Sequence, residues 1–356
     1  MVNLKIFNIG LVLLILLGTA GVFLFPHTFD PARLSAYFSR TVAIVHTPDS
    51  EPVELSGWVA QWEEDRAYSM LNETVPSLRL VAPQWYMVNK NFEIEEVGIK
   101  EKAAMVRHLK EKGMKVMVLM SSDLKAEELS PLLNSHTKYT ALAHSAAEKA
   151  TALGADGIDV DLELITQKDK EVYLDFLQAM QGELHTRGME MSVCVPPQTG
   201  WDDWEGVLGV DIRRAAKIAD EVHVMAYDKH GTGTLPGAIA PPDWVKAVAR
   251  FSQENIPPEK LVFGVASYGY LWQVGSTTPE PMLYSEFMRR TQSFGYTLSR
   301  DSDTQELVAK KAGYEGWASD HVTIAARIAL LQSLGIKQVI VWNLSGIDEE
   351  LFRHAL

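Results

Sequence analysis

The chain has 356 residues, enough for one barrel-sized domain or for two ordinary domains. Its hydrophobic content of 47% and charged content of 22% are typical of a folded globular protein. The formal net charge of −13 argues against a nucleic-acid partner, because phosphates would be repelled, but it leaves neutral polymers such as glycans open.

The N-terminal segment differs from the rest of the chain. Lys5 precedes an apolar run over residues 9–25 that contains no Asp, Glu, Lys or Arg. The run is short for a bilayer span, yet longer than the usual core of a secretory signal, and residues 18–20 offer a small-residue cleavage site. We therefore expect residues 1–29 to be a transmembrane anchor or a cleaved signal. In both cases Lys5 stays cytoplasmic, and the remainder lies outside the cell membrane or is secreted.

A linker is predicted to follow this segment, over residues 30–54. Asp30 followed by Pro31 is typical of a helix start, with an N-cap and then proline at the first helical position. The spacing of apolar residues predicts a short amphipathic helix over residues 31–46, close to the membrane.

From residue 55 onward one pattern recurs, in which a helical segment ends in glycine and a short apolar strand follows. Glycine suits the left-handed residue after a helix, and nearly continuous apolar strands are typical of a buried parallel sheet. A helix is predicted over residues 170–187, where apolar side chains keep helical spacing on one face. Eight strands alternating with helices predict a (β/α)8 TIM barrel, with a doubly wound open sheet as the alternative. The predicted strands begin near Leu55, Leu78, Lys115, Gly157, Met189, Glu221, Leu261 and Lys337.

The interval between the seventh and eighth predicted strands is too long for a single connection. Residues 285–291 have a helical pattern, and residues 297–299 and 306–311 have strand patterns. We therefore expect one catalytic barrel over residues 55–356, with a small α+β insertion at about residues 272–320.

Neither cysteines nor histidines suggest a cofactor. Cys194 is the single cysteine, so the chain can form no internal disulfide and no cysteine-rich zinc site. Its apolar surroundings predict a buried free thiol. The ten histidines show no ligand-like spacing, so we expect no metal and no cofactor.

Three carboxyl groups alternate along the fourth predicted strand. Asp159, Asp161 and Glu163 are two residues apart, so all three point to the same face, which in a barrel is the interior. Burial and mutual repulsion raise the pKa values of such groups, and the strands offer no matching set of inward Lys or Arg. Magnesium or calcium binding is one explanation. Glycoside hydrolysis is the other, and we favour it because it uses paired carboxyl groups with different pKa values.

The same strand resembles a known family. The run DGIDVDLE at residues 156–163 resembles the signature of glycoside hydrolase family 18, the chitinase-like enzymes. The run MAYD at residues 225–228 and Trp342 at the end of the eighth strand match two further features of that family. The runs GAIAP at 237–241 and YGYLW at 268–272 resemble the bacterial cell-wall and spore-germination branch.

The resemblance implies a role for each residue that matches a motif. Glu163 would protonate the glycosidic oxygen and then act as the base for water. Asp161 would orient and stabilise the N-acetyl group of the substrate, and Asp159 would position Asp161 by sharing a proton with it. Tyr227 would donate a hydrogen bond to the acetamido oxygen, and Asp228 would contact the same sugar.

Aromatic residues are expected to contribute to sugar binding. Trp342 would form the apolar floor of the site, although packing in the core is the alternative. About half of the other tryptophans at the predicted strand ends are expected to stack on sugars, and the rest to pack the barrel mouth. The further substrate-binding candidates are Trp58, Trp85 and Gln84, and the remaining tryptophans near strand ends are Trp62, Trp201, Trp204 and Trp272.

We therefore predict a monomeric, extracytoplasmic hydrolase of polymers that contain β-linked N-acetylglucosamine, with a retaining, substrate-assisted mechanism. Peptidoglycan is preferred over chitin-type oligosaccharides, because an anchored enzyme works beside the membrane. One alternative is a catalytically silent chitinase-like lectin, but such lectins typically lack the acid that Glu163 provides here. A membrane-bound scaffold is a third hypothesis, and it would leave the carboxyl groups without a purpose.

Overall fold

The computed structural model describes residues 52–73, 78–202 and 204–354. Within these ranges no helix is long and apolar enough to cross a membrane. The apolar run at residues 9–25 and the helix expected over residues 31–46 lie outside the described residues.

Eight parallel strands form a closed barrel, as predicted. The ring closes because β1 pairs with both β14 and β2, so the alternative of an open sheet is wrong. A ninth strand, β3 (Ile94–Glu96), pairs antiparallel with β2. Each barrel strand begins within two residues of its predicted start: β1 (Glu54–Val59), β2 (Leu80–Val88), β4 (Lys115–Ser121), β5 (Gly157–Asp161), β6 (Glu190–Val195), β7 (Glu221–Val224), β8 (Leu261–Ala266) and β14 (Gln338–Trp342).

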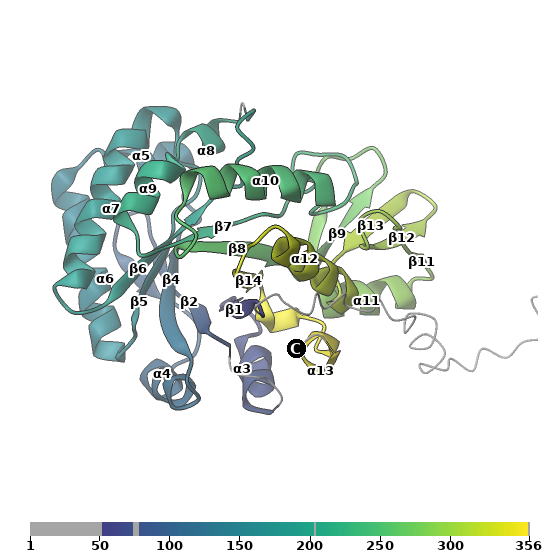
Figure 1. The fold of residues 1–356 in the computed structure, drawn as a ribbon, viewed down its shortest axis with the longest axis horizontal. Helices are drawn as coiled ribbons and strands as arrows, with labels where there is room; N and C mark the ends of the chain where they lie inside the picture. Colours follow the sequence, from purple (N-terminus) through teal and green to yellow (C-terminus); the bar gives the residue numbers. More distant parts are fainter. Residues whose placement is uncertain (1–51, 74–77, 203, 355–356) are drawn as a thin grey trace, which may run out of the picture. The chain divides into compact units, whose positions relative to one another are not determined.

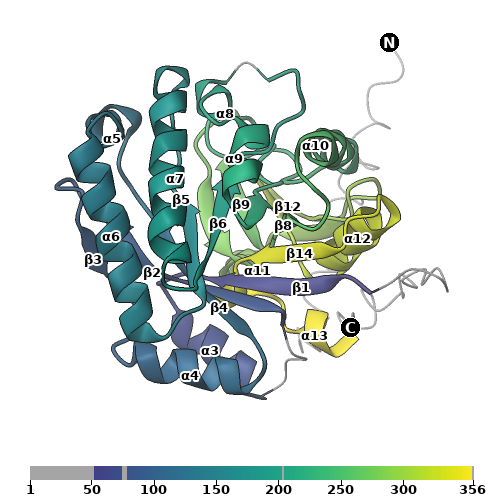
Figure 2. The same cartoon turned by 60° about the vertical axis from the view of Figure 1, so that its left-hand side comes forward.

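Helices surround this ring, as Figures 1 and 2 show. The helix predicted over residues 170–187 is α7, which ends at His185 and buries Tyr173, Phe176 and Leu177 against the sheet side. Gly154 ends α6 in the left-handed conformation, with φ of 74°, as the glycine pattern predicted. The helices are α3 (Glu64–Glu73), α4 (Lys102–Glu111), α5 (Ala126–Leu133), α6 (His136–Leu153), α7 (Lys170–His185), α8 (Glu205–Leu208), α9 (Ile212–Ile218), α10 (Pro242–Asn255), α12 (His321–Ser333) and α13 (Glu350–His354).

An α+β insertion lies between β8 and β14 (Figure 1). Its antiparallel strands are ordered β10-β9-β13-β12-β11, and α11 packs on β9 and β10. Its elements are β9 (Tyr268–Gln273), β10 (Glu280–Leu283), α11 (Tyr284–Ser293), β11 (Thr297–Arg300), β12 (Leu307–Lys311) and β13 (Tyr314–Ala318).

The predicted start of this insertion, at about residue 272, needs correction. Residues 268–272 do not end the seventh barrel strand, because β8 stops at Ala266 and Tyr268 begins a strand of the second sheet. The apolar run continues across the boundary without a break, so its pattern does not reveal where the chain changes sheets. Ser267 marks the change, since its backbone NH and hydroxyl donate to the carbonyls of Trp342 and Asn343.

Candidate active site

The alternating carboxyl groups of β5 lie at three depths of the barrel interior. Asp159 is fully buried, Asp161 is half-buried at the strand end, and Glu163 follows the strand with an exposed face. Asp156 lies outside this alternation. It accepts hydrogen bonds from the backbone NH of Val116 at 2.8 Å and from Lys110 Nζ at 2.7 Å, so it holds strand ends together.

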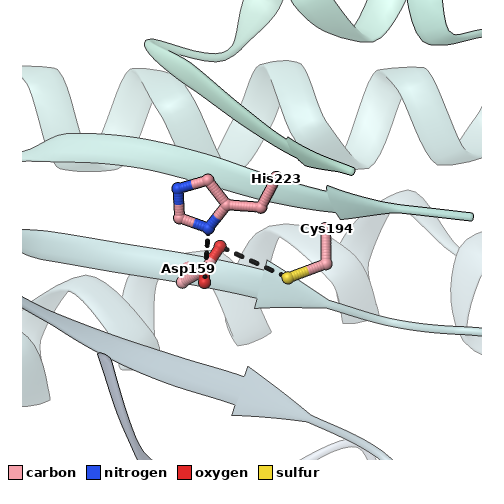
Figure 3. A group of neighbouring side chains, drawn as sticks. All are labelled: Asp159, Cys194 and His223. Atoms are coloured by element: carbon pink, nitrogen blue, oxygen red, sulfur yellow. Dashed lines mark hydrogen bonds and ion pairs between the residues drawn. The ribbon is translucent and has the colours of Figure 1, made fainter. Parts of the chain in front are cut away.

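Four donors surround the Asp159 carboxylate. Its Oδ2 accepts from Trp58 Nε1 at 2.8 Å and from His223 Nδ1 at 2.9 Å. Its Oδ1 accepts from Ser192 Oγ at 2.7 Å and from Cys194 Sγ at 3.6 Å (Figure 3). Burial alone would raise the pKa of Asp159, but the charge of His223 and these hydrogen bonds together lower it. These contacts therefore favour the ionised form of Asp159 in the centre of the barrel.

A line of charges continues from Asp159 toward the opposite end of the barrel. His223 Nε2 lies 3.3 Å from Glu221 Oε2, and Arg79 binds both oxygens of Glu221 at 2.7 and 2.8 Å. Lys115 Nζ lies 3.5 Å from Glu221 Oε1. Burial opposes the charged form of His223, but Asp159 and Glu221 raise the pKa of its imidazole to about 9.

His223 therefore corrects one expectation drawn from the sequence. The carboxyl groups do have an inward basic partner, but it is a histidine rather than a lysine or arginine. The sequence did contain a sign of this partner. Glu221 and His223 are two residues apart in β7, at an even spacing from Tyr227, so the alternation of side chains predicts that they face the interior. The sequence analysis considered the histidines only as metal ligands, and the spacing typical of such ligands does not identify a histidine that binds carboxylates.

Asp161 and Glu163 are in a different electrostatic state from Asp159. Asp161 Oδ1 is buried without a hydrogen-bond partner. Burial, Glu163 and Asp159 hold the pKa of Asp161 well above its usual range. Burial among the surrounding atoms and the charge of Asp228 also raise the pKa of Glu163, even though its side chain keeps an exposed face. This pair can therefore hold a proton at a pH where ordinary carboxyl groups are ionised.

A cavity of about 900 Å³ opens beside Glu163. Tyr227 and Asp228 from the end of β7 line it together with Glu163, so three of the predicted site residues meet here. Asp228 adopts a left-handed conformation with φ of 63°, uncommon for a residue other than glycine and often found at functional sites.

The insertion contributes residues that the sequence analysis did not assign to the site. The Tyr268 hydroxyl donates a hydrogen bond to Asp228 Oδ1, and Tyr270 lines the cavity. Burial raises the pKa of Asp228, although hydrogen bonds from these two tyrosines oppose the rise. The alternation of Tyr268, Tyr270 and Trp272 along one strand face was visible, but its position beside Asp228 was not.

Trp342 is half-buried and lies among other indole rings. Its ring packs edge-on against Trp58 at 5.9 Å and against the exposed Trp62 at 6.2 Å. Trp342 is thus partly accessible, as a sugar-facing residue must be, and its role as the floor of the site stays a prediction.

Three of the substrate-binding candidates, Trp58, Trp85 and Gln84, are buried and do not line the cavity. Trp58 and Trp85 are 1% and 0% exposed, so neither offers a ring face to a sugar. Trp58 instead binds Asp159, and Trp85 Nε1 donates to Glu64 Oε2 at 3.2 Å. Gln84 is buried, and its amide donates to Ser121 Oγ at 2.8 Å instead of lining the cavity. A position near a strand end does not show whether an indole is buried among the strands or lines the cavity.

Two of the tryptophans near predicted strand ends do line the cavity, and Trp244 of α10, which the sequence did not single out, lines it too. Trp201 and Trp204 are 93% and 55% exposed, on the loop between β6 and α8 that lines one wall. We predict that replacing both with alanine raises KM for a polymeric glycan roughly 3- to 10-fold per residue and leaves kcat nearly unchanged, since one aromatic contact is worth about 0.5–1.5 kcal/mol. Steady-state kinetics measure this. Phe294→Ala is the control, because Phe294 is 59% exposed, close to the value for Trp204, but lies outside this cavity. A fall in kcat with constant KM would contradict the prediction.

Two clusters among the described residues offer several ligand atoms that a metal ion could use. In the first, Asp159, Cys194 and His223 offer ligand atoms within 4.8 Å of one another. The direct contact of 2.9 Å between His223 Nδ1 and Asp159 leaves no space for an ion between them (Figure 3). Burial and nearby Asp159 raise the pKa of the Cys194 thiol, which disfavours the thiolate that a metal needs.

The second cluster consists of Asp320, His321 and Asp348. Arg300 binds both oxygens of Asp320, and His321 Nδ1 binds Asp348 at 2.6 Å. The carboxylates of both clusters are thus satisfied by protein donors.

The chain matches a known protein family over most of its length. The family model for glycosyl hydrolases family 18 matches residues 57–346. An uncharacterized glycosylase of Bacillus subtilis is 24% identical over 81% of this chain and 86% of its own length. A cortical fragment-lytic enzyme of the same organism is 25% identical over 65% of this chain and 56% of its own length.

Solved structures share the fold. The spore cortex-lytic enzyme SleL of Bacillus megaterium has a TM-score of 0.73 at 20% identity, covering 86% of this chain and 74% of that protein. A chitinase from Chromobacterium violaceum has a TM-score of 0.74 at 18% identity, covering 85% and 97%.

Proposed function

Because this chain belongs to glycosyl hydrolase family 18, we propose that it cleaves β-glycosidic bonds in polymers that contain N-acetylglucosamine. The observation that carries the proposal is the position of Glu163, whose raised pKa suits a general acid, on the wall of a large cavity. Tyr227 and Asp228 line the same cavity, and Asp161 lies close enough to Glu163 and Tyr227 to raise the pKa of Tyr227 and to have its own pKa raised by Glu163.

The proposed chemistry is retaining and substrate-assisted. Glu163 donates its proton to the glycosidic oxygen, and the acetamido oxygen of the substrate attacks the anomeric carbon from the opposite side. Asp161 stabilises the acetamido NH as positive charge develops on the ring that forms. Tyr227 orients the acetamido oxygen, and Glu163 then removes a proton from the water that opens the ring.

Peptidoglycan is the proposed substrate, with chitin-type oligosaccharides as the alternative. Matched relatives from three Bacillus species are named cortical fragment-lytic enzymes, which supports a cell-wall polymer, although this chain spans only 56–64% of their lengths. The apolar segment at residues 9–25 supports the same choice, because an enzyme held at the membrane meets the wall before it meets free chitin.

The test is to incubate the protein with purified peptidoglycan and with chitooligosaccharides, and to identify new reducing ends by mass spectrometry. We expect products that end in N-acetylglucosamine, with the faster release from peptidoglycan. Faster release from chitooligosaccharides would reverse the choice of substrate. Tight binding of either glycan without cleavage would instead support the lectin alternative.

A further inference from the structure

We propose that His223 is a positioning residue for the active-site acids: as a buried cation it keeps Asp159 ionised, so that the proton needed for catalysis stays with Asp161 and Glu163. This inference rests on the proposed function and adds a residue to it. It also differs from the proton sharing between Asp159 and Asp161 that the family resemblance implied.

The first reason is the hydrogen bonding of the imidazole itself. His223 is fully buried, and each of its ring nitrogens faces a carboxylate oxygen, Asp159 Oδ2 on one side and Glu221 Oε2 on the other. An ionised carboxylate only accepts hydrogen bonds, so both nitrogens must carry a proton. With both carboxyl groups ionised, this geometry requires an imidazolium ion.

The second reason is the balance of charge around the ring. Glu221 is held as an anion by Arg79, which directly precedes β2, and by Lys115, the first residue of β4. The pKa of Glu221 lies well below its usual range: burial alone would raise it, but His223 and Arg79 lower it. Glu221 in turn stabilises the charge on His223.

The other groups near the ring do not neutralise it. Trp58 from β1 packs edge-on against His223 at 5.7 Å between ring centroids and carries no charge. Cys194 from β6 stays a thiol because burial and Asp159 raise its pKa. At the outer end of the line, Glu190 and Glu54 contact Lys115 and Arg79 at 2.6 and 3.8 Å.

The third reason concerns where the proton can go. Trp58 and His223 both donate to Asp159 Oδ2 and neither can accept, so a proton on that oxygen would break one of these bonds. Ser192 and Cys194 occupy Oδ1. Asp161 has fewer donors: its Oδ1 is buried without a hydrogen-bond partner, and the hydrogen bond from Cys194 only partly offsets the rise in its pKa that burial, Glu163 and Asp159 cause. A proton in this stack is therefore held by Asp161 and Glu163 and remains available to the general acid.

The test compares His223→Asn with the wild-type protein. Asparagine places a neutral NH donor near the position of Nδ1 but removes the charge. Loss of a buried cation makes nearby acids bind protons more tightly, so both limbs of the pH profile of kcat/KM should move to higher pH by about 1–3 units. An unchanged profile would show that only the hydrogen bond matters, and it would overturn the proposal.

A surface pair provides the matched control. His185 Nε2 binds Asp220 at 2.9 Å, but both residues are partly exposed and lie outside the barrel interior. His185→Asn therefore removes a similar histidine–aspartate contact and should leave both limbs in place. A shift of equal size in this variant would also overturn the proposal, because it would trace the effect to charge in general.

A second measurement needs neither turnover nor a stable variant. Nitrogen-15 NMR of the imidazole rings in the wild-type protein should show His223 doubly protonated at pH 7 and still so at pH 8. A neutral tautomer at pH 7 would refute the inference. If the wild-type protein cleaves no glycan, the proposed function fails, and the NMR result still decides the state of His223.

Discussion

Replacing Glu163 with glutamine is expected to abolish turnover while leaving folding and glycan binding nearly intact. Glutamine keeps the size of the side chain but cannot donate the proton that the leaving sugar needs. The loss of a positioned acid and base should reduce kcat by at least ~10²–10⁴-fold. Reducing-end assays give the rate, and calorimetry with a chitooligosaccharide gives the affinity.

Glu259→Gln is the control for this change. Glu259 is exposed and lies outside the cavity lining, so this variant should behave as the wild type. A rate near that of the wild type in the Glu163 variant would refute the assignment of the acid. A melting temperature so low that the variant is unfolded under the assay conditions would show that it loses activity by unfolding.

Removing the acetyl group from the sugar before the cut is expected to stop cleavage almost completely. Asp161 ends β5 and Glu163 follows it two residues later, a spacing that spans at most ~7 Å of extended chain. Asp161 is therefore badly placed to attack from the side opposite the acid. The acetamido oxygen is the remaining nucleophile, and an internal nucleophile of this kind is worth on the order of 10⁵ M or more in effective concentration.

The measurement is NMR of the first products from acetylated and deacetylated oligosaccharides of the same length. We expect retained anomeric configuration with the acetylated substrate and inhibition by a thiazoline that mimics the cyclised sugar. An inverted product, or rapid cleavage after a glucosamine residue, would exclude substrate assistance. Binding of the deacetylated oligosaccharide, measured separately, distinguishes lost chemistry from lost affinity.

Local patterns in the chain were sufficient to predict the barrel. Apolar runs located all eight barrel strands, because strand burial on both faces leaves a continuous apolar signature. Four of these strands, β4, β5, β6 and β14, also follow a glycine in the left-handed conformation after a helix. The spacing of Asp159, Asp161 and Glu163 likewise predicted three inward carboxyl groups, since side chains alternate along a strand. The insertion was predicted less well, because β9 continues the apolar run of β8 without a visible boundary.

Contacts between distant residues decided the rest of the site. Trp58 binds Asp159 across 101 positions of the chain, His223 binds it across 64, and Arg79 reaches Glu221 across 142. Periodicity within one strand indicates which face a side chain occupies, but not which neighbour lies opposite it or at what depth. The carboxyl groups and their direction therefore followed from the order of residues alone. The buried cation, the indole that binds Asp159 and the tyrosines beside Asp228 emerged only once the ring had closed and brought their strands together.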